Sequence, residues 1–289
     1  MNEYYHTNYP IPLHIPPTPS SFDNIPHDLE TELRIYGCEL IQKAGYLLKI
    51  PQVCMATGQV LFQRFYHNES MKNYDVRYIA MGSLFLASKV EENLAPPRNV
   101  IIIFHHLLRP NYPAIEPASQ EYWDIKEKMF KAEMDVLRVL GFHTKIHHPH
   151  KFILMYAKIL NLNGETLQIA WNCANDCLKT QIVIRWAYAP WIVATACIFF
   201  AAHKKDLKLP NKWYELFDTT KNQILQIIGE LVQLYRRSSP AVWHRIEGCI
   251  NNLDMVYFYS ILFLSFIFTS FCLIFALLFF IDCFLFIYK

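Results

Sequence analysis

The stretch Ser83–Glu92, SLFLASKVEE, runs through small and large apolar side chains and ends in a lysine and two glutamates. The wider segment from Ile79 to Ala87 is apolar or small on every side, which is typical of a helix surrounded by other helices. At about 100° per residue, Lys89 continues the face of Gly82 and Phe85. The sequence therefore predicts a central helix whose lysine emerges at the edge of a helical bundle.

The composition extends this interpretation to the whole chain. Apolar residues recur at steps of three and four, and the 289 residues include only 8 glycines. With 53% hydrophobic and 18% charged residues, the chain can bury a sizeable core. These features predict an all-α protein. The net charge of +2, without a long basic block, gives no reason to expect direct binding to nucleic acid.

A second charge lies on an apolar face downstream. A helix is predicted from about residue 121 to 140, ended by Gly141, and Glu133 falls inside its apolar arc. A carboxylate there must be paired or must face a partner, because burying it alone is costly. One interpretation is an internal salt bridge of Lys89 with Glu133 or Glu92.

The other interpretation is an interface. Lys89 and Glu133 would then be polar anchors on an apolar docking surface that includes Val90, Leu137 and Phe142. Spacing alone does not choose between the bridge and the interface.

An internal similarity indicates two domains. IAMGSLFLASK (79–89) aligns with VATACIFFAAH (193–203) at Ile/Val, Ala/Ala, Phe/Phe and Ala/Ala positions. Two unrelated central helices could look alike, but the match favours tandem helical domains of ordinary size. We place them at residues 30–145 and 146–238, after an extended proline-rich arm at residues 1–29. In that arm a plain disordered leader is preferred over a proline-directed phosphorylation site at Thr18.

The cysteines and histidines favour no cofactor or metal. Eight cysteines are scattered through apolar segments, as expected of reduced intracellular thiols, and the first 20 residues do not resemble a secretory signal. Cys173 and Cys177, at i and i+4, are interpreted as core residues. The four histidines of HTKIHHPH (143–150) lack the spacing of a zinc set.

The C-terminal segment, residues 239–289, is hydrophobic. No charged residue occurs from Met255 to Ile281, and about 20 apolar residues suffice to span a bilayer. One interpretation is a transmembrane helix at about 255–281. The favoured one is read-through of a retained intron, a gene-model error or a variant isoform, so a membrane is expected as a partner only if the tail is genuine.

Several of these motifs resemble the cyclins. LFLASKVEE is similar to the signature helix of the cyclin box, and KAEMDVLRVLGF is similar to its fifth helix. CELIQKAGYLLKIPQVCMATGQVLFQRFY, HPHKFILMY and LPNKWYELF resemble the L-type cyclins, which are linked to transcription and splicing. The resemblance covers about residues 30–237 and implies two tandem five-helix cyclin boxes.

The resemblance also implies a function. A cyclin is a non-catalytic regulatory subunit that binds and activates a cyclin-dependent protein kinase. In the family, the lysine bonds backbone carbonyls and the glutamate bonds backbone amides beside the kinase helix that carries the catalytic glutamate. By position, Lys89 and Glu133 are the anchors, and Val90, Leu137 and Phe142 are apolar contacts. An L-type cyclin implies a nuclear protein, a PITSLRE-type kinase, and roles in RNA polymerase II transcription and pre-mRNA splicing.

Two departures and two rival classes accompany this resemblance. LRIYG (33–37) and Leu40 stand where cell-cycle cyclins carry a substrate-docking patch, and the arginine/serine-rich tail usual in L-type cyclins is replaced by the hydrophobic segment. A scaffold like general transcription factor IIB, binding DNA or polymerase, is the alternative, although a zinc ribbon and a strongly basic face are missing. An enzyme is not expected, because no glycine-rich phosphate loop, nucleophile elbow or HExxH run occurs.

Overall fold

The computed structural model describes residues 17–185 and 189–237, and these residues form helices and loops without a strand. The all-α prediction is therefore confirmed. The elements are α1 (Pro19–Phe22), α2 (His27–Leu48), α3 (Gln52–Asn68), α4 (Val76–Val90), α5 (Pro97–Leu108), α6 (Gln120–Val139), α7 (His150–Ile159), α8 (Gly164–Cys177), α9 (Ile182–Arg185), α10 (Pro190–Lys204), the 3₁₀ helix η1 (Trp213–Phe217) and α11 (Lys221–Arg237).

Side-chain caps fix where several helices begin. Asp75 accepts a hydrogen bond from the backbone N–H of Arg77 at the start of α4, and Ser119 accepts one from Tyr122 at the start of α6. Such caps satisfy backbone donors that have no partner within the helix. α6 ends as predicted, because Gly141 has a φ of +56°. Glycine reaches this left-handed conformation without the steric cost that a Cβ brings.

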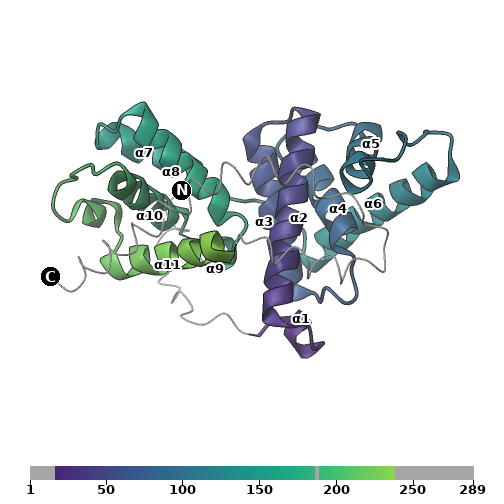
Figure 1. Ribbon diagram of the computed structural model, residues 1–289, viewed down its shortest axis with the longest axis horizontal. Helices are drawn as coiled ribbons and strands as arrows, with labels where there is room; N and C mark the ends of the chain where they lie inside the picture. The colour runs from purple at the N-terminus through teal and green to yellow at the C-terminus, as the bar shows by residue number, and fades with distance from the viewer. Residues whose placement is uncertain (1–16, 186–188, 238–289) are drawn as a thin grey trace.

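Two hydrophobic clusters organise the fold. The first gathers buried residues from α2 to α6, and the second gathers those from α7 to α11. Figure 1 shows these two groups of helices on opposite sides of the molecule. Two clusters are compatible with two domains, and the bounds 30–145 and 146–238 stay a prediction. A small third cluster of Ala56, Val60 and Leu178 joins α3 to the turn after α8.

Each cluster has one central helix. In α4 nearly every residue up to Ser88 is buried, and α10 is buried through most of its length. α4 packs against α2, α3 and α6, while α10 packs against α7, α8 and α11. The two sequence segments that resemble each other thus occupy equivalent places in their clusters.

Two predictions about the ends of the chain have different outcomes. The arm expected to be extended includes the helix α1, and Thr18 before it is buried, with its hydroxyl donating to Glu30 Oε2 at 2.6 Å. The extended arm is therefore wrong for Pro19–Phe22. The hydrophobic tail at residues 239–289, including the span at about 255–281, lies outside the described residues. Within the described residues, no helix combines the length and the apolar character needed to cross a membrane.

Gly82 lets α4 approach α6 closely. A Cβ at this position would lie 2.8 Å from the Cβ of Ala132 and 2.8 Å from the backbone nitrogen of Glu133. We expect Gly82→Ala to lower the free energy of unfolding by about 1–3 kcal/mol, because overpacking must separate the two helices. Urea denaturation followed by circular dichroism measures this change.

Gly229 in α11 provides the matched control. A Cβ there meets no atom within 4 Å, so Gly229→Ala should be neutral or stabilise the protein by up to about 1 kcal/mol. Equal effects of the two substitutions would show that the close approach of α4 and α6 does not constrain the fold.

Candidate functional site

The two charges singled out in the sequence meet in space. Lys89, in the last turn of α4, donates through Nζ to Glu133 Oε1 of α6 at 2.7 Å. The Glu133 side chain is only 8% exposed, whereas the Lys89 side chain is 42% exposed. The internal salt bridge of Lys89 is therefore present, and its partner is Glu133 rather than Glu92.

The packing of α4 on α6 positions this pair. Gly82 touches α6 next to Glu133, and Lys89 follows two turns later on the same face. The ammonium also lies over the Phe85 ring, 4.2 Å from its centroid, and Phe85 packs edge-on against Phe130 of α6. A cation over an aromatic face is attracted to the ring, so Lys89 is held by both a carboxylate and an aromatic side chain.

Val90, Leu137 and Phe142 differ in exposure. Val90 and Leu137 are partly buried and pack against the first cluster. Phe142 is 66% exposed, on the loop that follows α6. The site thus combines two half-buried aliphatic residues with one aromatic side chain that projects into solvent.

The conformation of Phe142 is fixed by the end of α6. Its backbone N–H donates to the carbonyl of Leu137 at 2.9 Å, and that of Gly141 donates to the carbonyl of Arg138 at 3.1 Å. These two bonds form a Schellman motif, in which the residue in the place of Phe142 commonly makes a hydrophobic contact with the helix. Phe142 instead has a φ of +62° and a largely exposed ring. A bulky residue in this region is an outlier, and strain of this kind is often found where a residue binds a partner.

Two exposed apolar side chains lie close in sequence to the pair, and the sequence did not single them out. Met134 follows Glu133 in α6 and is 58% exposed, and Leu94 lies in the loop between α4 and α5 and is 66% exposed. Met134 could have been noticed, because it is an apolar residue beside Glu133 at a position that the helical period assigns to solvent.

A polar chain ties the end of α4 to the segment between the two clusters. Thr57 of α3 is fully buried, and its hydroxyl donates to Glu91 Oε1 at 2.6 Å and lies 2.8 Å from Nε2 of His148. Burial lowers the pKa of His148 to about 3, so its ring is neutral at physiological pH. Glu91, which directly follows Val90, is therefore anchored to α3 through a buried threonine.

His150 and the cysteines Cys173 and Cys177 have structural roles. Nε2 of His150 lies 2.9 Å from Oδ1 of Asn175, which also accepts from Gln52 of the first cluster. These two histidines therefore take part in contacts between the clusters. Cys173 and Cys177 are buried in the second cluster, which confirms their interpretation as core residues. Cys197 of α10 lies beside them, and no pattern in the sequence indicated this proximity.

Known proteins resemble this chain in sequence. A family model described as "Cyclin, N-terminal domain" matches residues 3–145. Cyclin-L1 of Gallus gallus is 44% identical over 227 residues, which are 76% of this chain and 42% of the relative. Cyclin-L2 of Homo sapiens is 41% identical over 242 residues, which are 81% of this chain and 46% of the relative. The chain thus spans less than half the length of these relatives.

Solved structures share the fold. A chain in the crystal structure of the yeast RNA Pol II CTD kinase CTDK-1 complex aligns with a TM-score of 0.63 at 18% identity, covering 72% of this chain and 67% of that chain. A chain in the structure of the CAK complex from Chaetomium thermophilum bound to ATP-gamma-S aligns with a TM-score of 0.54 at 16% identity, covering 78% and 74%. The family model, the identity to L-type cyclins over three quarters of the chain and the shared fold show that this protein belongs to the cyclin family, within its L type.

Proposed function

We propose that this chain is a non-catalytic regulatory subunit that binds and activates a cyclin-dependent protein kinase. The observation that carries the proposal is the Lys89–Glu133 pair, which joins the end of the central helix α4 to α6 and keeps the Lys89 side chain 42% exposed. Membership of the cyclin family supports the class of partner.

The internal bridge is compatible with docking. A lysine ammonium has three donors, and an ionised carboxylate has about four acceptor sites, so a single bond between them leaves capacity on both groups. A partner's backbone carbonyl can be added to Lys89, and a partner's backbone N–H can be added to Glu133. The bridge and the cation–π contact hold the two groups in place before binding, which lowers the ordering cost of association.

The apolar neighbours supply the other part of a docking surface. Phe142, Met134 and Leu94 are each more than half exposed. Exposed aromatic and methionine side chains are enriched at protein interfaces, where a few of them dominate the binding energy. The surface we propose therefore consists of Lys89, Glu133, Val90, Leu137 and Phe142, with Met134 and Leu94 at its margin.

The finer assignments rest on the L type. We propose a PITSLRE-type kinase as the partner, a nuclear location, and a role in RNA polymerase II transcription and pre-mRNA splicing. The identity of 41–44% to L-type cyclins supports these assignments.

A reconstituted kinase assay tests the proposal. The purified full-length chain is mixed with the PITSLRE-type catalytic domain, and the rate of peptide phosphorylation is compared with that of the catalytic domain alone. We expect complex formation and a large rise in rate. Activation of a different cyclin-dependent kinase only would refute the finer assignment, and binding to none would refute the proposal in favour of a scaffold.

Phe142 is expected to contribute to binding without contributing to the fold. Phe142→Ser removes an exposed ring at a left-handed position, so we expect kinase affinity to fall by about 10-fold or more, as for an interface hot spot. Calorimetric titration measures the affinity, and urea denaturation should show an unchanged or slightly higher stability. Leu216→Ser, which changes a side chain of η1 that is 73% exposed, is the control and should leave affinity unchanged.

A further inference from the structure

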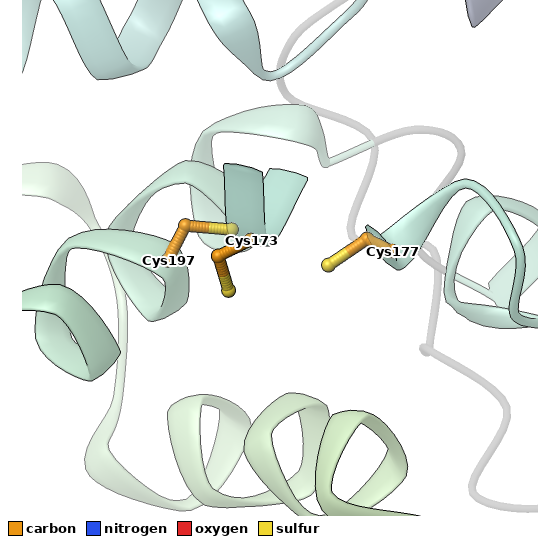
Figure 2. Close-up of side chains that lie close together, drawn as sticks. All are labelled: Cys173, Cys177 and Cys197. Atoms are coloured by element: carbon orange, nitrogen blue, oxygen red, sulfur yellow. The ribbon is translucent and has the colours of Figure 1, made fainter. Parts of the chain in front are cut away.

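Three cysteines converge in the core of the second cluster. Cys173 and Cys177 lie one turn apart on α8, and Cys197 lies on α10. Their Sγ atoms all lie within 4.8 Å of one another, and each residue is at most 1% exposed. Figure 2 shows the sulfur atoms of Cys177 and Cys197 both pointing toward Cys173. The segments that supply these thiols are twenty residues apart, and the packing of α8 on α10 brings them together.

The donor set consists of sulfur alone. Among the described residues, the group of potential metal ligands at this place contains only the three cysteines. The nearby carboxylate of Asp176 is engaged elsewhere, since it accepts from Tyr235 and pairs with Lys179. Isoleucines of α11, such as Ile224 and Ile227, belong to the same buried cluster. The site therefore offers three soft ligands in apolar surroundings.

This donor set selects among thiophilic ions. Structural zinc sites are almost always four-coordinate, and these residues supply three ligands. Three thiolates around a divalent ion would also leave a net charge of −1 in an apolar core, which is costly without a counter-ion. Three thiolates around a trivalent ion are neutral. A trivalent metalloid such as arsenic(III) satisfies all three conditions: it prefers soft ligands, it binds three of them, and the resulting site is neutral.

We propose that Cys173, Cys177 and Cys197 form a three-thiol binding site for a trivalent metalloid of the arsenic(III) type. Arsenous acid, As(OH)₃, exchanges its three hydroxyl groups for three thiolates. Three As–S bonds form, three As–O bonds break, and each thiol proton leaves with a hydroxyl group as water. The product is As(SR)₃, and no atom is oxidised or reduced.

The geometry needs little adjustment. Metal–sulfur bonds of about 2.3 Å in a trigonal arrangement place the sulfurs about 4 Å apart, and a pyramid places them closer. The present separations of up to 4.8 Å shrink to this value by small rotations of the cysteine side chains.

The bound ion would tie α8 to α10, so it should stabilise the second cluster as a crosslink does. Because the thiols are buried, entry requires local opening of the two helices, and binding should be slow.

Intact-mass spectrometry under native conditions tests the site. The full-length chain carrying Cys249→Ala, Cys272→Ala and Cys283→Ala keeps only the five cysteines of the described residues. After incubation with sodium arsenite in a thiol-free reductant, we expect the mass to increase by one arsenic atom less three hydrogen atoms. We also expect the thermal midpoint of unfolding to rise.

Variants in this background locate the site. Cys197→Ala should abolish both the mass gain and the thermal shift, whereas Cys54→Ala, which removes a fully buried thiol of α3, should preserve both. If Cys197→Ala does not fold, as judged by its circular dichroism spectrum, Cys177→Ala takes its place in the same test. Three results would overturn the proposal. The first is that the triple-alanine chain binds no arsenic, and the second is that it binds arsenic through two thiols with one hydroxyl group retained. The third result is an unchanged three-thiol mass gain in the Cys197→Ala or Cys177→Ala variant.

Discussion

Glu133→Ala is expected to weaken kinase binding by roughly 2–5 kcal/mol, a loss of about 30-fold to about 4,000-fold in affinity. The side chain is 8% exposed and holds Lys89, so its removal deletes an acceptor for the partner's backbone and leaves the lysine without its carboxylate. Lys89→Ala should have an effect of similar size. Calorimetric titration of the kinase catalytic domain with each full-length variant measures the loss.

The chain offers a closely matched control for this prediction. Lys205 at the end of α10 and Glu165 of α8 form an ion pair at 2.6 Å, compared with 2.7 Å for Lys89 and Glu133, and Lys205 is 41% exposed compared with 42% for Lys89. Lys205→Ala should leave kinase affinity unchanged. If both lysine variants lost affinity equally, the effect would be one of general charge, and the docking surface would be wrong.

A double-mutant cycle separates docking from folding. If Lys89 and Glu133 act as one unit, the double variant should lose less affinity than the sum of the two single losses. Circular dichroism should show a helical fold in all three variants. Full binding by a folded double variant would mean that the pair only joins α4 to α6.

The helical period of the sequence was enough to predict the central elements. An all-round apolar segment at Ile79–Ala87 predicted a surrounded helix, and α4 is one. The apolar stripe and Gly141 predicted the helix that is α6 to within one residue at each end. The period assigns a residue to a face, and for Glu133 it assigned the buried face correctly.

The period cannot show which polar side chains meet. Lys89 has both Glu92 and Glu133 within reach by sequence reasoning, and only the approach of α4 to α6 at Gly82 selects Glu133. Cys197 joins Cys173 for the same kind of reason, since the contact depends on how α10 packs on α8. Exposure of Phe142 depends on a loop conformation that the residue type itself disfavours, so no local pattern could indicate it.

Arg34 is the most consequential residue that the sequence did not reveal. It stands in the LRIYG stretch of α2, yet its side chain is 2% exposed. Its five N–H groups are all used: Nε and Nη2 donate to Glu30 Oε1, Nη2 also donates to the carbonyl of Tyr66, and Nη1 donates to the carbonyl and to the side-chain oxygen of Gln63. Thr18 completes the group by donating to Glu30 Oε2.

Arg34→Met is therefore expected to lower the free energy of unfolding by about 3–5 kcal/mol, because it leaves the Glu30 carboxylate and two backbone carbonyls buried without their donors. Urea denaturation of the full-length variant, followed by circular dichroism, measures the loss. Arg34→Lys should restore only part of it, since an ammonium has three donors and cannot reproduce the planar fork of a guanidinium.

The double variant Arg34→Met, Glu30→Met decides whether charge burial causes the loss. Removing both members of a buried ion pair is often nearly neutral, whereas removing one leaves a charge without compensation. We therefore expect the double variant to be more stable than Arg34→Met alone, with part of the loss remaining from the carbonyls of Gln63 and Tyr66. If the second substitution instead added its own loss in full, the destabilisation would come from packing around α2 and α3, and the ion pair would not be what fixes this part of the first cluster.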